Sequence, residues 1–572
     1  MAIKRYIADA DNTITNAFNS NLTTRGTGSN MGESDILEVF SLYGQASGSS
    51  GLSSELSRVL IKFPVADMST DRTAGELPAS GSVKWILRMF NAPHGQTLPK
   101  KFTLNVYALA KDWEEGFGLD MESYSDLTND GEGSNWENAS ENVQWSTPGG
   151  DFLVTGSGKN DAKAYTHYFE KGTEDLELDI SELVEEWLDG GSVSNYGLAV
   201  FLSGTQEAFF SGSGLTVQGG DFGTGKPEIP IDHKEVGGTP VYTATPAVSG
   251  NVLFNITGSF ESFYTKRFFA RGSEFFYKRP CIEARWDDTA KDDRGQFHYS
   301  SSMAPSQDNL NTLYFYNVVR GRLVNIPDVN NVFVTLFSGS DMGADSTEIS
   351  GGMTDTPPSK LILSVPGEAQ NICAGLDTAT GSAISTGVYT CTVCLTASYA
   401  ENPLTVIHDV WHSADLKAAG NVTYFTGTIR PIVLQPYSYD PTDTYVTNIT
   451  NLRSSYSTQE KARFRMFVRP RDWQPNIFNK ATQFIPNTIV NSGSYRVVRT
   501  IDDLDVIKYG TGSIETSLRH THLSYDSEGN YFDLDMELLE PGYSYQIKFT
   551  YYNDSIGSWV EQPQTFKFRV EK

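Results

Sequence analysis

Cysteine is scarce in this chain, with four residues in a total of 572. Four cysteines cannot staple so long a chain, which excludes the disulfide-rich class of small secreted domains, and we expect free thiols. No uncharged apolar run approaches the ~20 residues that a bilayer-spanning helix needs, so we expect no membrane insertion. The first residues lack the apolar segment of a secretory signal, and we therefore expect synthesis in a cytoplasm.

Basic residues are also few. Lys and Arg number 44 against 70 Asp and Glu, which gives a formal net charge of −26. Because such a chain repels a phosphate backbone, we expect no nucleic-acid partner. The acidic excess lies mainly in residues 1–230, whereas residues 441–572 are nearly balanced. From this difference we expect the C-terminal region to dock and the N-terminal region to project outward.

Motifs that would indicate catalysis are missing as well. The chain has no GxSxG, no HExxH, no P-loop and no dinucleotide fingerprint, and it holds only eight histidines. Acidic pairs are abundant, but the carboxylate separation that a glycosidase needs cannot be read from a sequence. We therefore expect no enzymatic activity and no cofactor.

Short runs of β-branched and aromatic residues are what the chain has in abundance. They predict strands, and those with the clearest pattern are residues 58–63, 82–90, 102–109, 196–202, 332–337, 360–365, 387–395, 462–468 and 543–551. Turn-forming residues separate them, which is typical of all-β proteins built from sandwiches. One amphipathic helix is predicted at 179–190, where five apolar residues share a face and Gly190 ends it.

Turn-rich and proline-rich segments at 218–240, 327–332 and 434–443 indicate boundaries between regions. The fold class is therefore all-β, with tandem β-sandwiches. The predicted domains are a jelly-roll-like sandwich over 1–230, a β-rich segment over 231–330 that is separate or continues the first domain, a β-sandwich over 331–440, and a C-terminal β-sandwich over 441–572. We expect the later sandwiches to be immunoglobulin-like or similar.

Residues 1–230 resemble the DNRLRE domain family in the order and spacing of several short elements. These are residues 8–17, the strand Trp85 to Phe90, Leu104 to Leu109 followed by Asp112 and Trp113, the pair Asn135 and Trp136, the helix end Glu186 to Gly190, and Asn195 to Leu198. The resemblance implies a jelly-roll-like β-sandwich similar to carbohydrate-binding modules, in a family found on surface proteins and in virion proteins. The loop at 48–54 and the acidic insertion at 120–141 depart from the family pattern, so a ligand-binding face does not carry over.

Three tryptophans, Trp113, Trp136 and Trp145, are the candidate ligand-binding residues. An exposed indole can stack on a sugar ring, which makes a glycan the ligand class that they would take. The alternative for each of them is core packing, because tryptophan is usually well buried.

Two clusters have metal-type ligands without the spacing that a metal site needs. The acidic residues of 120–132 have oxygens of the kind that Ca²⁺ prefers but not the EF-hand order, which favours a solvated loop. Cys391 and Cys394, with Cys373, His408 and His412 not far along the chain, have a zinc-like spacing. Strand residues three apart point to opposite faces, so we predict no metal site here.

Two hypotheses of function follow. The leading one is a non-enzymatic structural component of a phage virion, in the tail, neck or baseplate region, made in the host cytoplasm and located in the virion. It would assemble with other virion proteins and with copies of itself through large interfaces, and would contribute to attachment to the host surface. The alternative is a carbohydrate-binding cell-surface or adhesion module that takes a host surface glycan.

Overall fold

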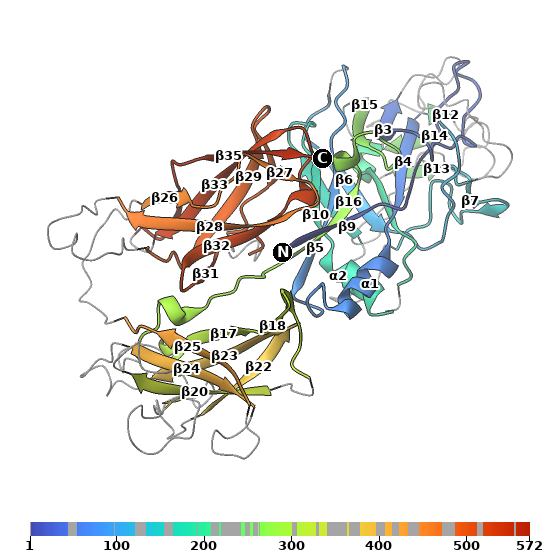
Figure 1. Ribbon diagram of the computed structural model, residues 1–572. Helices are drawn as coiled ribbons and strands as arrows, with labels where there is room; N and C mark the ends of the chain where they lie inside the picture. Colours follow the sequence, from blue (N-terminus) through green and yellow to red (C-terminus); the bar gives the residue numbers. More distant parts are fainter. Residues whose placement is uncertain are drawn as a thin grey trace. The chain divides into compact units, whose positions relative to one another are not determined.

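The computed structural model describes residues 2–43, 54–95, 98–119, 133–153, 164–191, 193–207, 217–218, 242–245, 252–255, 261, 263–299, 306–327, 331–339, 363–364, 378–395, 406–413, 422–432, 445–471, 487–511, 519–553 and 556–572. The chain forms two compact units, Ile3–Trp286 and, together with the first two residues, Asp287–Lys572. Both are built from β-sheets with few helices, which confirms the all-β, tandem-sandwich class (Figure 1). No helix among the described residues is long and apolar enough to cross a membrane.

The unit Ile3–Trp286 contains a two-sheet β-sandwich. The smaller sheet has the strand order β1-β16-β5-β10, and the larger has the order β15-β3-β4-β11-β6-β9, with β2 paired to β4. The strand bounds are β1 Ile3–Ile7, β2 Ala10–Thr15, β3 Ile36–Tyr43, β4 Ser54–Lys62, β5 Val83–Met89, β6 Phe102–Ala108, β9 Ala164–Phe169, β10 Leu176–Asp179, β11 Leu198–Leu202, β15 Phe263–Phe269 and β16 Cys281–Trp286. Shorter strands form two minor sheets, β7 Asn138–Ser140 with β8 Val143–Gln144, and β12 Val217–Gln218 with β13 Tyr242–Thr245 and β14 Val252–Asn255.

Both faces of the larger sheet are buried. Alternation along β4 sends Val59 and Ile61 into the core shared with the smaller sheet, and sends Leu56 and Leu60 into a second cluster on the opposite face. The segment that follows β6 covers this opposite face and contributes the predicted tryptophans to its cluster. The large sheet is therefore the middle layer of three.

Among the described residues, three α-helices accompany these sheets. The predicted amphipathic helix is confirmed as α2 Ser181–Leu188, followed by Gly190 in the left-handed conformation at φ 66°. The helix α1 Val65–Ala74 was not predicted, because its only fully buried residue is Met68 and it has little apolar periodicity. The third, α3 Gly204–Glu207, is a single turn after β11.

The structure places the end of the first domain at Trp286 rather than at residue 230 or 330. Strand β16 pairs with β1 and β5, and β15 pairs with β3, so residues 263–286 complete both sheets of the first sandwich. Figure 1 shows this as a green strand, β16, next to blue ones. The sequence hid the arrangement because the turn-rich segment before β15 resembles a linker.

The unit Asp287–Lys572 holds two further groups of strands. The first forms one sheet of order β17-β23-β22-β20-β24-β25, with β21 paired to β23. Its bounds are β17 Asn311–Tyr316, β20 Asn331–Gly339, β21 Leu363–Ser364, β22 Ala379–Ser385, β23 Val388–Leu395, β24 Val406–His412 and β25 Thr423–Ile429, and a hairpin of β18 Val318–Val319 and β19 Arg322–Leu323 follows β17. Because β17 belongs to this sheet, the predicted boundary near 330 falls inside a domain.

The C-terminal strands, from β26 onward, form two further sheets. One sheet has the order β26-β28-β32-β31 and the other the order β27-β35-β33-β29-β30, with β34 paired to β33. The bounds are β26 Tyr445–Ile449, β27 Ser455–Ser457, β28 Lys461–Pro470, β29 Gly493–Arg499, β30 Leu504–Ile507, β31 Ser524–Asp526, β32 Gly529–Asp535, β33 Ser544–Asn553, β34 Ser558–Glu561 and β35 Phe566–Glu571. This unit also has three short 3-10 helices among its described residues, η4 Asp293–Gly295, η5 Ser306–Asn309 and η8 Met536–Leu538. A further one, η3 Phe276–Lys278, belongs to the unit Ile3–Trp286.

Candidate functional site

The three predicted tryptophans lie together in the layer that covers the outer face of the larger sheet. Trp113, Trp136 and Trp145 are each 5% exposed and belong to one hydrophobic cluster. The indole N–H of Trp113 donates to the carbonyl oxygen of Tyr196 at 2.8 Å, and that of Trp145 to the carbonyl oxygen of Asn135 at 2.9 Å. The packing alternative therefore describes them, and their predicted ligand-binding role has no exposed ring face to support it.

Beneath these rings lies a buried ion pair that the sequence analysis did not identify. Arg58 of β4 donates from Nε to Oε1 of Glu207 at 2.9 Å and from Nη2 to Oε2 at 2.8 Å. The two residues are 1% and 3% exposed, and the guanidinium lies 5.2 Å from the ring centroid of Trp136. The sequence carried one signal of this site, because Arg58 stands between Leu56 and Leu60 on an apolar side of the strand.

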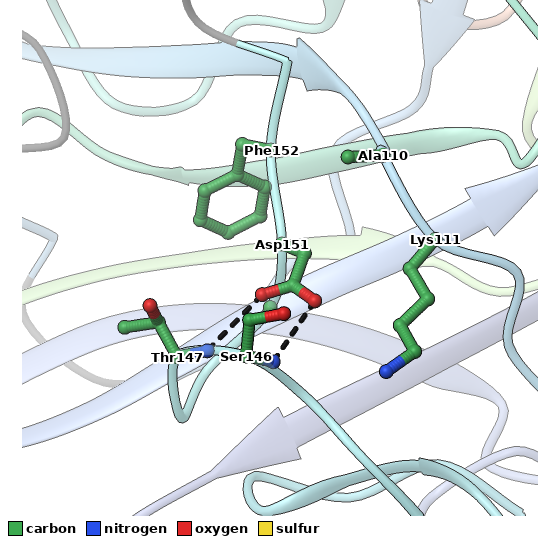
Figure 2. A pocket seen from close by; sticks show the side chains of 7 residues that line it. Ala110, Lys111, Ser146, Thr147, Asp151 and Phe152 are labelled. Atoms are coloured by element: carbon green, nitrogen blue, oxygen red, sulfur yellow. Dashed lines mark hydrogen bonds between the residues drawn. The ribbon is translucent and has the colours of Figure 1, made fainter.

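A polar pocket lies at the edge of the same covering layer (Figure 2). Its volume is about 430 Å³, and its lining is Ala110, Lys111, Ser146, Thr147, Gly150, Asp151 and Phe152. The carboxylate of Asp151 accepts hydrogen bonds from the backbone N–H of Ser146 at 2.9 Å and of Thr147 at 3.1 Å, so it fixes the turn that forms one wall. The pocket thus offers hydroxyls, one cation and one aromatic ring to a polar ligand.

A buried carboxylate marks the start of β2. Asp11 is fully buried, and its Oδ2 accepts from the backbone N–H of Arg271 at 2.6 Å, whereas its Oδ1 has no partner. The neighbouring Glu115 accepts from the Arg271 guanidinium at 2.7 and 3.0 Å. Burial raises the pKa of Asp11 to about 7, and the negative charge of Glu115 acts in the same direction. This group is therefore poised to exchange a proton near neutral pH.

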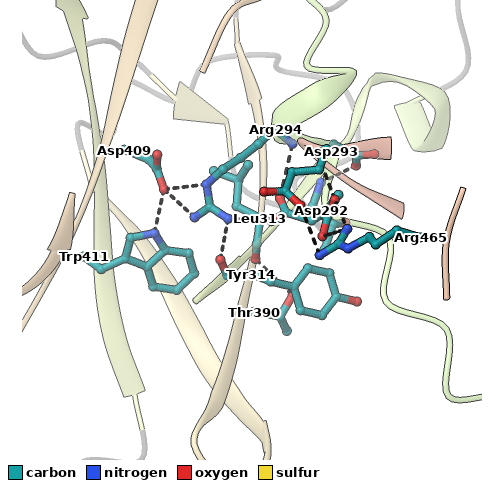
Figure 3. A network of polar contacts seen from close by, with 12 residues as sticks. Asp292, Asp293, Arg294, Leu313, Tyr314, Thr390, Asp409, Trp411 and Arg465 are labelled. Atoms are coloured by element: carbon teal, nitrogen blue, oxygen red, sulfur yellow. Dashed lines mark hydrogen bonds and ion pairs between the residues drawn. The ribbon is translucent and has the colours of Figure 1, made fainter. Parts of the chain in front are cut away.

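The second unit has its own buried charged network, which centres on the 3-10 turn η4 (Figure 3). Arg294 donates to Oδ2 of Asp409 at 2.6 and 3.2 Å, to Oδ2 of Asp292 at 2.6 Å and to the carbonyl oxygen of Tyr314 at 2.5 Å. The indole N–H of Trp411 donates to the same oxygen of Asp409 at 2.8 Å. Burial raises the pKa of Asp292 to about 6, although Arg294 opposes the shift.

The first residue of this turn, Asp293, joins two groups of strands. Asp293 accepts from the backbone N–H of Thr312 in β17 at 2.6 Å and from the hydroxyl of Tyr525 in β31 at 2.8 Å. The backbone N–H of Asp292 also donates to the carbonyl oxygen of Tyr525 at 3.1 Å. The turn therefore bonds to the seven-stranded sheet on one side and to the C-terminal sandwich on the other.

The hairpin of β18 and β19 presents apolar side chains to solvent. Its two-residue turn has positive φ at both positions, 52° at Arg320 and 78° at Gly321, as a tight hairpin turn requires. Three of its aliphatic side chains are strongly exposed, Val318 at 56%, Val319 at 49% and Leu323 at 44%, as is the next residue, Val324, at 42%. Such a concentration on one short hairpin is typical of an interaction surface.

The structure describes only some of the residues that the sequence offered as metal ligands. The acidic run 120–132 and Cys373 lie outside the described residues. Cys281, Cys391 and Cys394 are free and buried, in agreement with the expectation of free thiols. His412 shares a 3.0 Å hydrogen bond with the hydroxyl of Thr335. Within the described ranges, no group of three or more His, Cys, Asp or Glu side chains is arranged to hold a metal ion.

Comparison with known proteins gives no assignment. No family model matches the chain, and no curated protein matches it in sequence. The resemblance of residues 1–230 to the DNRLRE family therefore stays a prediction.

Proposed function

We propose that this chain is a non-enzymatic structural component of a phage virion, in the tail, neck or baseplate region, that assembles through protein interfaces with copies of itself and with other virion proteins. The observation that carries the proposal is the exposed apolar hairpin of β18 and β19. Solvated aliphatic side chains gain free energy when a partner covers them, at roughly 25 cal/mol per Å² of apolar surface removed from water.

The charge of the hairpin favours a second copy of the chain as its partner. Arg320 and Arg322 flank the apolar residues at the turn, whereas the chain as a whole carries a net charge of −26. A basic tip on an acidic protein is attracted to the acidic surface of another copy, and opposite charges steer and orient such an encounter. The network around η4 supports the same role, because it ties two groups of strands into one body suited to a scaffold.

Light scattering on the purified full chain tests the interface. We expect Val318→Lys with Val319→Lys to lower the molar mass of the assembly relative to wild type. Ile501→Lys is the matched control, because Ile501 is a single exposed aliphatic residue in a turn, at 76% exposure, and this variant should keep the wild-type mass. A wild-type chain that stays monomeric at every concentration would contradict the self-assembly.

Antibody labelling of purified particles tests the virion assignment. We expect the chain among the particle proteins, with label at one defined position. A chain found only in the soluble fraction of infected cells would contradict the proposal.

A second candidate function, carbohydrate binding, is favoured by the polar pocket of Figure 2. Lys111, Ser146 and Thr147 offer donors and hydroxyls to sugar groups, and Phe152 offers a ring face. A glycan array with the full chain tests it, comparing wild type with Lys111→Ala and with Thr147→Ala. Lys101→Ala is the control, since Lys101 is a largely exposed lysine that does not line the pocket. Binding that is absent in wild type, or that is insensitive to the pocket variants, would exclude this function for the site.

A further inference from the structure

Lys266 is a buried amine at an apolar position of the first sandwich. Alternation along β15 places Tyr264 and Phe268 in the core, and Lys266 lies between them on the same face. The side chain is 0% exposed. The ring centroids of Phe169 and Phe268 lie 4.8 and 5.1 Å from Nζ, so aromatic rings surround the amine. Burying a charged amine at such a position is costly unless it is paired and hydrogen-bonded.

The partners of the amine are neutral oxygens. Nζ donates to Oδ1 of Asn91 at 2.7 Å, to the carbonyl oxygen of Glu174 at 2.7 Å and to the carbonyl oxygen of Gly172 at 3.0 Å. Within the part of the chain that the structure describes, no carboxylate forms an ion pair with it. Burial lowers the pKa of Lys266 to about 8, against the weaker pull of Asp175 and Glu174. Near neutral pH, a larger fraction of Lys266 is therefore in the neutral, nucleophilic amine form than of an exposed lysine.

The carboxamide of Asn91 is held against this amine. Asn91 directly follows Phe90 at the end of β5, and it forms a single antiparallel bridge with Phe268 of β15. Its backbone N–H donates to Oδ1 of Asp175 at 2.8 Å. Because a C=O bond is about 1.23 Å long, a 2.7 Å contact from Nζ to Oδ1 puts the amide carbon no farther than about 4 Å from Nζ.

The geometry also orients the amine. Gly172 has φ +82°, and a Cβ at this position would meet the carbonyl oxygen of Pro99 at 2.3 Å, so only glycine can present its carbonyl to Nζ here. With Gly172 and Glu174 each accepting one hydrogen from the amine, the remaining donor direction, or the lone pair after deprotonation, faces the side chain of Asn91. Reacting atoms at van der Waals distance in a dry site are the condition for an accelerated intramolecular reaction.

From this arrangement we propose that Lys266 and Asn91 form an intramolecular amide bond that links the two sheets of the first sandwich. The ammonium of Lys266 gives up a proton, and the neutral amine attacks the side-chain carbonyl carbon of Asn91. The tetrahedral intermediate collapses with loss of the carboxamide nitrogen, which takes the proton and leaves as ammonium. One C–N bond forms and one C–N bond breaks, with no oxidant and no co-reactant.

Asp175 is a positioning residue in this reaction. It bonds to the backbone of Asn91, so it fixes the carboxamide without touching the bond that forms. Its negative charge also favours the ammonium form of Lys266. We therefore expect Asp175→Asn to reduce the fraction of linked chain at a fixed time after synthesis, with the unlinked remainder still folded.

Intact-mass measurement of the purified full chain under denaturing conditions tests the bond. We expect a mass lower by one ammonia molecule than that of the sequence, after allowance for removal of the first methionine. Trypsin digestion should release one branched peptide that joins the segments around residues 91 and 266. Lys266→Met and Asn91→Ala should each show the full mass of their own sequence, with no loss of ammonia and no branched peptide.

Lys62→Met is the matched control. Lys62 lies in another strand of the same sheet and pairs with Asp112 at 2.6 Å, so this variant should keep the branched peptide. A wild-type chain of full mass that trypsin cleaves after Lys266 would overturn the proposal. This result comes from wild type alone, so it does not depend on whether a variant folds. Loss of ammonia without a branched peptide would also overturn it, because cyclisation of one asparagine gives the same mass.

Discussion

Two buried cations of the first sandwich, Arg58 and Lys266, are held in different ways. Arg58 lies on the outer face of the larger sheet, and both oxygens of Glu207 accept from it in a fork. Lys266 lies on the inner face of the same sheet, and its hydrogen bonds within the described ranges go to neutral oxygens. Both stand on an apolar side of an alternating strand, and both lie close to aromatic rings.

The difference shows how the partner decides what a buried cation can do. A carboxylate fork holds the guanidinium in one geometry, and removing the guanidinium leaves the opposite charge buried without its partner. Neutral oxygens hold Lys266 in place without a carboxylate hydrogen-bonded to it, and burial outweighs the pull of Asp175 and Glu174, so the amine can become neutral and react. The four predictions below test this contrast, in order of decreasing effect.

Asn91→Ala should cause the largest loss. Removing a cross-link that closes the loop between residues 91 and 266 costs about 5 kcal/mol of unfolding free energy in the chain-entropy account. Lys266→Met should cost a similar amount, and the double variant no more than either single one, because both remove the same bond. Urea unfolding of the full chain measures the three values, and additive losses would argue for two independent contacts.

Arg58→Met should cause the second-largest loss of unfolding free energy. It leaves the Glu207 carboxylate buried without its partner, which costs about 3–5 kcal/mol. Lys62→Met in the same strand breaks a partly exposed pair with Asp112 and should cost less than about 1 kcal/mol. Tryptophan fluorescence reports on this layer during urea unfolding, since Trp136 stacks on the guanidinium. Equal losses in the two variants would show that the fork contributes no more to stability than the partly exposed pair does.

Asp11→Asn should change how the free energy of unfolding depends on pH, which distinguishes this buried acid from the two buried cations. Because burial raises the pKa of Asp11 to about 7, the folded state binds the proton more tightly than the unfolded state does. Its contribution to stability is fully present below pH about 4 and is lost as pH rises through about 7, a change of no more than about 4 kcal/mol. The variant should remove that loss between pH 4 and pH 8 in thermal unfolding, and an unchanged slope would contradict the assignment.

Tyr525→Phe should have the smallest effect of the four. It removes the hydroxyl that bonds Asp293 and should cost about 1.5 kcal/mol, typical of a hydrogen bond to a charged group. Differential scanning calorimetry of the second unit's transition measures it. Tyr552→Phe, in the exposed part of β33, is the control and should change little.

Much of the fold could be predicted from alternation, and the exceptions have physical causes. The runs 58–63, 102–109 and 462–468 lie in strands β4, β6 and β28, because one-sided burial imposes a period of two on the sequence. The domain end could not be placed, since β15 and β16 pair with strands more than two hundred residues earlier. Long-range pairing of this kind leaves no local mark.

The candidate sites were harder to predict for a related reason. Composition and motif identify residues, but whether a tryptophan is open or packed depends on which segment covers it, and Trp113, Trp136 and Trp145 turned out to form the cover. Arg58 and Lys266 were visible only as charged residues on apolar sides of strands. That signal becomes decisive only when the face that each strand buries is known.

The pairing of Ile3–Ile7 with Cys281–Trp286 also determines how late in synthesis the first sandwich can form. Strand β1 leaves the ribosome well before β16, so it cannot pair with that strand until the residues between them have been made. At about 5–20 residues per second, the opening strand stays without its sheet for tens of seconds. During that time its edge is open to other chains, so a chaperone or rapid hand-over to an assembly partner would matter most for this end of the protein.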